Sequence, residues 1–264
     1  MPPEPASHRQ AVARTAEVIA LGARHADRAS AWAARLGLPY RIEDGNGPTA
    51  GAGARLEVDD AGLALRVGDG PIVRLDVLAL LRSERKGKDL LGRAVGRESR
   101  TVVDATAGLG RDGVHLAAIG KEVTLVERVP LVAALVEDAL ARASGAGGDA
   151  SAVVARLRLV NADARAYLNA LVTSGGERPD AVLLDPMYPE RGKTALPGKG
   201  MALFRDLVGD DEDAPELLAV ALRVAVRRVV VKRPVAAPRL AGPAPVGAVR
   251  GRTTRFDIYA PRAP

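Results

Sequence analysis

From Thr101 onward the sequence alternates between short apolar runs and amphipathic stretches, and this alternation restricts the fold more than any other feature. The runs that we predict as strands span 101–104, 122–126, 157–160, 181–184 and 228–232, and the predicted helices span 112–119, 130–143, 164–172 and 214–225. Alternation of this kind implies a mostly parallel sheet with helices on both faces, which is an α/β fold. Segments 246–250 and 255–259 are predicted to close the sheet as a terminal hairpin.

The residues before this domain form a different pattern, which predicts a small α+β unit over 15–92 and places the α/β domain at 93–264. Its predicted elements are strands at 17–21 and 72–75, a helix at 25–36 closed by Gly37, and a hairpin of 55–58 with 63–67 around Asp59-Asp60-Ala61-Gly62. Two Gly-, Pro- or Ala-rich segments are predicted to lack regular structure, a disordered tail at 1–14 and a surface loop at 144–152.

Composition excludes several classes of protein. The chain has 264 residues, 47% hydrophobic and 27% charged, and no apolar run approaches the roughly 20 residues of a membrane helix. Without cysteine it has no disulfides or thiolate metal site, and its three scattered histidines argue against a histidine-rich one. We therefore expect a cytoplasmic monomer with no metal and no membrane contact. The net charge of +6 suits RNA, although an arginine-rich composition gives the same charge without an RNA partner.

A glycine-rich turn follows the first strand of the α/β domain. Residues 108–113, Gly-Leu-Gly-Arg-Asp-Gly, match G-x-G-x-x-G, with Gly108 and Gly110 as its first two glycines. Glu127 lies 19 residues after Gly108, at the end of the next strand, where a carboxylate accepts hydrogen bonds from ribose hydroxyls. This pattern alone allows a nicotinamide dinucleotide or S-adenosylmethionine (SAM).

Three acidic positions favour SAM. Asp104 ends the first strand, where a carboxylate repels a pyrophosphate but attracts an ammonium and a sulfonium. Asp163 follows the third strand, where it can meet an adenine amino group, and Asp185 follows the fourth. Open α/β sheets bind ligands at the carboxyl ends of their strands, and all these positions lie there. Any one of them is also consistent with a capping or turn aspartate.

The stretch Asp185-Pro186-Met187-Tyr188-Pro189 carries the chemistry that we predict. It resembles the Asp/Asn-Pro-Pro-Tyr/Phe motif of methyltransferases that act on exocyclic base amines or glutamine amides. Such an amine is a poor nucleophile, and acceptors on its hydrogens, here Asp185 and the carbonyl of Pro186, help to rehybridise it. Tyr188 offers a face for stacking a base. The same five residues also fit a proline-rigid turn whose tyrosine packs in the core.

The chain resembles the ribosomal RNA small subunit methyltransferase J family. The resemblance is carried by DATAGLGRDG (104–113), LVERVPLVAAL (125–135), LLDPMYP (183–189), RVVVKRP (228–234) and RFDIYA (255–260). It implies a Rossmann-like SAM-dependent methyltransferase fold, with SAM as methyl donor, S-adenosylhomocysteine as product, and 16S rRNA or the small ribosomal subunit as partner. The implied reaction is methylation of the N2 amine of a guanosine near the 3′ end of 16S rRNA.

The candidate site residues follow from the motifs and the resemblance together. The resemblance implies SAM contacts at Arg111, Asp112, Glu127, Arg128, Asp163, Ala164 and Asp185, to which the turn adds Asp104, Gly108 and Gly110. The predicted catalytic residues are Asp185, Pro186 and Tyr188. Candidate RNA contacts are the cations of two basic clusters, Arg82, Arg85, Lys86, Lys232 and Arg233, for which solvated or salt-bridged roles are equally consistent.

Three other functions remain open at this stage. One is a methyltransferase for another nucleic-acid base amine, including DNA, or for a protein amide. Another is a non-catalytic RNA-binding assembly factor that holds SAM as a structural ligand. The last is an NAD-dependent dehydrogenase.

Overall fold

The computed structural model describes residues 16–43, 53–83, 89–186 and 213–261. Contacts within the chain divide it into two compact units. Described residues 16–75 belong to the first unit, and those from 76 onward belong to the second. Each unit has its own sheet, and we describe them separately. The domain limits expected from the sequence stay a prediction.

The first unit is a four-stranded sheet with the order β2-β1-β3-β4. Strand β1 (Glu17–Leu21) pairs in parallel with β2 (Tyr40–Glu43) and with β3 (Ala54–Asp59), and β3 pairs antiparallel with β4 (Gly62–Val67). The short 3-10 helix η1 (Ala23–His25) leads into helix α2 (Ala26–Leu36), which packs on β1 and ends at Gly37 with a left-handed φ of 64°.

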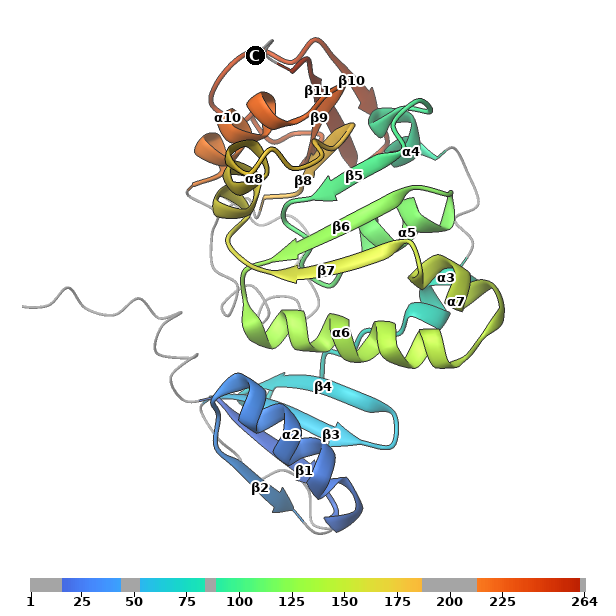
Figure 1. Cartoon of the computed structure of the whole chain (residues 1–264), viewed down its shortest axis with the longest axis vertical. Helices are drawn as coiled ribbons and strands as arrows, with labels where there is room; N and C mark the ends of the chain where they lie inside the picture. Colours follow the sequence, from blue (N-terminus) through green and yellow to red (C-terminus); the bar gives the residue numbers. More distant parts are fainter. Residues whose placement is uncertain (1–15, 44–52, 84–88, 187–212, 262–264) are drawn as a thin grey trace, which may run out of the picture. The chain divides into compact units, whose positions relative to one another are not determined.

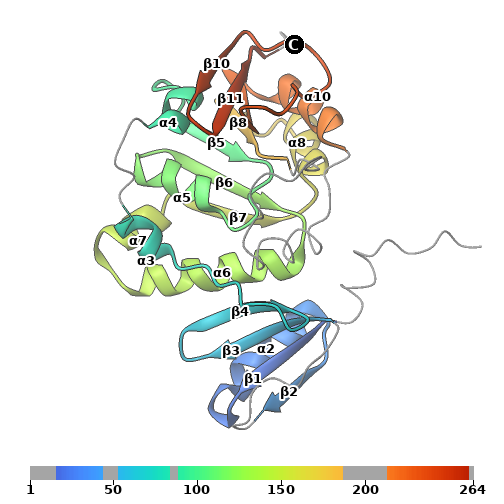
Figure 2. The same cartoon turned by 180° about the vertical axis from the view of Figure 1, so that it is seen from behind.

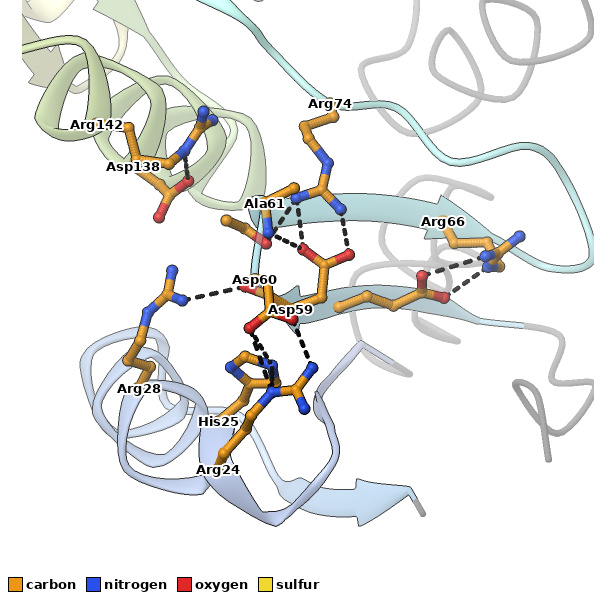
Figure 3. A network of polar contacts seen from close by, with 12 residues as sticks. Arg24, His25, Arg28, Asp59, Asp60, Ala61, Arg66, Arg74, Asp138 and Arg142 are labelled. Carbon is orange, nitrogen blue, oxygen red and sulfur yellow. Dashed lines mark hydrogen bonds and ion pairs between the residues drawn. The ribbon is translucent and has the colours of Figure 1, made fainter. Parts of the chain in front are cut away.

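The β3–β4 hairpin is held by a network of polar contacts around Asp59 (Figure 3). One Asp59 oxygen accepts the backbone N–H of Ala61 at 2.9 Å, and both oxygens pair with Arg74 at 2.7 and 2.6 Å. The next residue, Asp60, pairs with Arg24. The turn chemistry predicted from the sequence is thus present, and it is reinforced by arginines from distant positions in the chain.

The second unit is a seven-stranded sheet with the order β10-β11-β9-β8-β5-β6-β7. Five strands run parallel: β5 (Thr101–Asp104), β6 (Glu122–Glu127), β7 (Leu157–Asn161), β8 (Ala181–Leu184) and β9 (Arg228–Pro234). The chain first builds β5, β6 and β7 toward one edge and then returns to place β8 on the other side of β5. A ligand crevice forms where the strand order reverses in this way, so β5 and β8 mark the expected site.

A hairpin of β10 (Gly247–Arg250) and β11 (Thr254–Tyr259) extends the sheet beyond β9, with β11 antiparallel to β9. Helices cover both faces, as the two opposite views show (Figures 1 and 2). Helices α4 (Leu90–Val95) and α5 (Arg111–Ala118) lie on one face, and α8 (Ala164–Thr173) packs against α10 (Ala214–Val224) on the other. The remaining helices are α3 (Val77–Arg82), α6 (Pro130–Gly145), which packs along β6 and β7, and α7 (Gly148–Val154). These elements confirm the predicted α/β class.

Aliphatic side chains fill the space between the sheet and the α8–α10 pair. The cluster includes Val182, Leu184, Val229 and Val231 from the central strands, all fully buried, and Leu168 from α8. Strands buried on both faces are expected to be continuously apolar, which explains runs such as Ala-Val-Leu-Leu in β8. Among the described residues, no helix is both long and apolar enough to cross a membrane.

Two predicted elements differ in the structure, and one strand was not predicted. Residues 72–75 do not form a strand, and only Val73 makes a single bridge to Leu65. Residues 144–152 are not one loop, because α6 extends to Gly145 and α7 begins at Gly148. Strand β2 was not predicted, since its four residues follow Leu38-Pro39, a pattern that favours a turn. The tail at 1–14 lies outside the described residues.

Candidate functional site

The glycine turn connects the end of β5 to the start of α5. Gly108 and Gly110 have φ of 52° and 69°, in the left-handed region that favours glycine. A Cβ on Gly113 would lie 2.2 Å from Leu125 Cδ2, so this glycine lets α5 approach β6 closely. The three glycines thus have separate physical roles, the first two in the turn and the third in helix packing.

Glu127, at the end of β6, fixes this turn from the neighbouring strand. The carboxylate is buried, with the residue 4% exposed, and its two oxygens accept the backbone N–H groups of Gly108 at 2.8 Å and Val129 at 2.7 Å. Each oxygen of an ionised carboxylate has a second lone pair. The Glu127 carboxylate thus lies at the carboxyl edge of the sheet, and its contact with a ribose stays a prediction.

A cluster of three aspartates and one lysine lies at the strand reversal, where the fold predicts a crevice. Lys232 of β9 places its ammonium 2.5 Å from an oxygen of Asp112 and 2.7 Å from an oxygen of Asp185. Asp112 comes from the first turn of α5, and Asp185 directly follows β8. Burial lowers the pKa of Lys232, but Asp185 and Asp112 outweigh that effect and raise its pKa. Lys232 therefore stays charged.

Asp104, the last residue of β5, is the buried member of this cluster. It is 2% exposed, and one oxygen accepts the backbone N–H of Thr106 at 3.4 Å. Burial, with smaller contributions from the charges of Asp112 and Asp185, raises the pKa of Asp104 to about 8. At neutral pH, without a cation beside it, this group is therefore largely protonated.

The backbone of Asp185 is held by the glycine turn. Its N–H donates to Thr106 Oγ1 at 2.6 Å, and the carbonyl of Leu183, two residues earlier, accepts the N–H of Ala105 at 2.9 Å. Pro186 is buried next to it. The predicted stacking residue, Tyr188, lies outside the described residues. Thr106 was not predicted as a site residue, because nothing in the sequence distinguishes it within a run of small residues.

The other predicted SAM contacts lie around the same edge. Asp163 is the N-cap of α8 and accepts the N–H of Ala166 at 2.9 Å, and Ala164 is the buried first residue of that helix. Arg111 is exposed at the first position of α5. Arg128 lies 3.5 Å from the carboxylate of Asp213. Asp163 thus caps α8, as one interpretation of the sequence allowed. A contact with adenine would use acceptor positions of its carboxylate that the cap does not use.

The candidate RNA contacts have different surroundings. Arg82 is exposed at the end of α3, and Arg85 and Lys86 lie outside the described residues. Arg233 is 4% exposed and donates to the carbonyl of Pro238 at 3.1 Å. Lys232 faces the two carboxylates described above. The salt-bridged alternative weighed for Lys232 therefore describes its position in this structure.

A second buried arginine, which the sequence analysis did not single out, holds the segment after β9. Arg255 of β11 pairs with Asp257 at 3.0 Å and donates to the carbonyls of Val235 and Ala237 at 2.7 and 2.6 Å. Arg255 is 5% exposed and Asp257 is 2% exposed. The turn that follows Lys232 is therefore fixed by buried charged groups.

Comparison with known proteins agrees with this geometry. A family model described as "Putative SAM-dependent methyltransferase" matches residues 50–261. A solved SAM-dependent methyltransferase of Neisseria gonorrhoeae superposes with a TM-score of 0.72 at 34% identity, covering 92% of this chain and 96% of that one. The fold, the carboxyl-edge site and these matches place the chain among the SAM-dependent methyltransferases.

Curated relatives narrow this class. The chain is 47% identical to ribosomal RNA small subunit methyltransferase J of Thioalkalivibrio sulfidiphilus, over 88% of this chain and 92% of the relative. It is 45% identical to the protein of the same name from Pseudomonas aeruginosa strain UCBPP-PA14, over 93% and 95%. The chain belongs to the ribosomal RNA small subunit methyltransferase J family, as its sequence motifs indicated.

Proposed function

We propose that this chain transfers a methyl group from SAM to the exocyclic N2 amine of a guanosine near the 3′ end of 16S rRNA. The observation that carries the proposal is the position of Asp185. Its side chain lies in the acidic cluster at the strand reversal, and its backbone is bonded to the glycine turn. The acceptor for a substrate amine is thus built into the site where a nucleoside cofactor is expected. The names of the relatives supply the RNA class.

The acidic groups of the cluster outnumber its one lysine, which suits the two cationic groups of SAM. SAM carries an ammonium and a sulfonium, and Asp104, Asp112 and Asp185 present carboxyl groups on three neighbouring elements. Glu127 accepts the ribose hydroxyls, and Asp163 and Ala164 lie at the adenine. Arg111 pairs with the methionine carboxylate, and Gly108 and Gly110 allow close approach of the backbone. Arg128 completes the proposed contacts.

The residues of this chain prepare the amine. When bound, SAM supplies an electrophilic methyl group. Asp185 and the carbonyl of Pro186 accept hydrogen bonds from the amine, which helps its nitrogen to become a nucleophile. Asp185 takes up the proton that the nitrogen loses when it gains the methyl group, and S-adenosylhomocysteine is the leaving group. Tyr188 stacks on the base that has been taken out of the RNA structure. The remaining task is to align nitrogen and methyl carbon, which is a positioning effect.

The partner in this proposal is 16S rRNA or the small subunit that contains it. Arg82, Arg85 and Lys86 are the proposed phosphate contacts. The protein is proposed to act as a monomer in the cytoplasm. Because such contacts are electrostatic, their removal should weaken RNA binding to different sequences by similar factors.

The test is nucleoside mass spectrometry of 16S rRNA from a strain that lacks the gene, mapped by fragment. We expect loss of one N2-methylguanosine near the 3′ end, restored by the wild-type gene. A gene carrying Asp185→Ala should not restore it, although the protein accumulates and retains much of its SAM binding. An unchanged methylation profile in the deletion strain would refute the rRNA assignment and direct the search to DNA and protein acceptors.

A further inference from the structure

Lys232 was a candidate for RNA phosphate binding, but its surroundings indicate another role. Its ammonium is 2.5 Å from Asp112 Oδ2 and 2.7 Å from Asp185 Oδ2, and its side chain is 27% exposed. We propose that Lys232 is a positioning residue for methyl transfer, which holds the Asp185 carboxylate in place and keeps it ionised as the acceptor for the substrate amine. This inference rests on the proposed function of the site.

The geometry around Asp185 supports this role of Lys232. Two independent contacts help to hold Asp185, Thr106 Oγ1 at its backbone N–H and Lys232 at its side chain. Lys232 is itself tied to Asp112 in the first turn of α5, so the cation is fixed by β9 and by α5 together. A carboxylate held at both its backbone and its side chain is preset for the amine, which is how an enzyme lowers the cost of orientation.

The charges around Asp185 also support this role of Lys232. Asp104 from β5, Asp112 from α5 and Lys232 from β9 are ionisable groups that lie around Asp185. Carboxyl groups packed together resist ionisation, and a cation in direct contact favours it. A protonated Asp185 would lose acceptor capacity towards the amine. Lys232 therefore supports the ionised form that the chemistry requires.

The neighbouring carboxylates compete with any RNA phosphate for the Lys232 ammonium. A phosphate that approached Lys232 would have to displace, or be repelled by, the carboxylates of Asp112 and Asp185. Like charges this close disfavour a phosphate contact. An arrangement in which the ammonium serves two carboxylates is consistent with a role inside the site, not with recognition of the RNA backbone.

The main experiment measures single-turnover methyl transfer against pH for the wild type, Lys232→Met and Lys232→Arg. Methionine keeps an apolar stem without the charge, and arginine keeps the charge. We expect Lys232→Met to lower the rate about tenfold to hundredfold, the factor for losing a charge-assisted hydrogen bond. KM for SAM should not rise, because the cluster becomes more negative. The acid limb of the pH profile should move to higher pH, and Lys232→Arg should restore its position.

Arg239→Met is the matched control, because Arg239 is an exposed cation in the segment after β9. It should leave the pH profile and the saturated rate unchanged. A double variant, Lys232→Met with Asp185→Asn, should lose no more rate than Asp185→Asn alone, since Lys232 acts through Asp185. An additional loss in the double variant would overturn the proposal.

Two other results would also contradict it. If Lys232→Met leaves the saturated rate unchanged but raises KM for RNA and lowers the slope of its salt dependence by about one, Lys232 is a phosphate contact. If the wild type transfers no methyl group to rRNA, the proposed function fails. The role of Lys232 is then tested separately by titrating the side-chain ¹³C signal of Asp185 in the protein without SAM or RNA. A titration midpoint that is the same in wild type, Lys232→Met and Lys232→Arg overturns the proposal, and a midpoint raised only in Lys232→Met supports it.

Discussion

Glu127 holds Gly108 across two neighbouring strands: the carboxylate at the end of β6 accepts the backbone N–H of the glycine turn at 2.8 Å. Its other oxygen accepts the N–H of Val129 at 2.7 Å. The residue proposed to bind the ribose therefore also shapes the turn that would surround the cofactor. A substitution at this position should affect both functions.

We predict that Glu127→Gln weakens SAM binding by about tenfold or more. The amide keeps one acceptor oxygen but places an N–H₂ group against a backbone N–H, and a charge-assisted hydrogen bond contributes about 1.5–3 kcal/mol. Isothermal titration calorimetry measures the affinity. Glu122→Gln is the matched control, because Glu122 is exposed at the opposite end of the same strand. Equal affinity for Glu127→Gln and wild type would reject the ribose assignment.

The raised pKa of Asp104 leads to a prediction of how protein stability changes with pH. This pKa of about 8 lies above the 3.8 that is usual for an aspartate, so between these values the folded protein binds a proton that the unfolded chain has released. The contribution of Asp104 to stability is therefore present below about pH 4 and is lost as the pH rises to about 8. Denaturant midpoints of wild type should fall relative to those of Asp104→Asn across this interval. A constant difference between the two proteins would contradict the assignment.

We also predict that the carboxyl group of Asp104 releases a proton when SAM binds. An ammonium or sulfonium beside Asp104 favours its ionised form, so the protonated fraction present at pH 7 should decrease when SAM binds. Calorimetry in buffers with different ionisation enthalpies measures the number of protons released, and Asp104→Asn should abolish this release. A binding enthalpy that is independent of the buffer in the wild type would show that SAM does not ionise Asp104.

The buried Arg255 predicts a large loss of stability on substitution. Arg255→Met leaves Asp257 buried without its cation and removes the donors to the carbonyls of Val235 and Ala237. Removing one partner of a buried pair costs about 3–5 kcal/mol. Arg252→Met, at an exposed residue before β11, should change stability by no more than about 0.5 kcal/mol. Chemical denaturation compares the two, and similar midpoints would show that the pair contributes little.

The elements of the second unit were predictable because their pattern is strong. Each parallel strand is a short apolar run next to an amphipathic helix, and each was located within a few residues. The elements that differ depend on weak or contradictory signals. Gly147 and Gly148, with φ of 71° and 58°, favour a loop, yet α6 ends at Gly145 and α7 already begins at Gly148. The buried Ala150 and Val153 of α7 supply the packing. Tertiary packing outweighed local propensity there.

For the site, the sequence predicted positions at strand ends but not the contacts between them. Lys232 is 120 residues from Asp112 and 47 residues from Asp185, so no local pattern shows that they meet. The pKa of Asp104 likewise depends on its burial, which is a property of the assembled sheet. Asp163 was expected at the adenine because it follows a strand, and the structure shows the capping role that its sequence position also allowed. A helix cap can be predicted because the capping residue is next to its helix in the sequence. The contacts of Lys232 with Asp112 and Asp185 can be seen only in the folded chain.

The hydrogen bond from Asp185 to Thr106 has a mechanical consequence. It joins the turn that would surround the methyl donor to the turn that would present the acceptor, across the two strands at the reversal of the sheet. Thermal displacements of one turn are therefore transmitted to the other through a contact of 2.6 Å. In a reaction that depends on aligning a nitrogen, a carbon and a sulfur, such coupling lets the donor and acceptor sites fluctuate together, so that their separation varies less than the position of either.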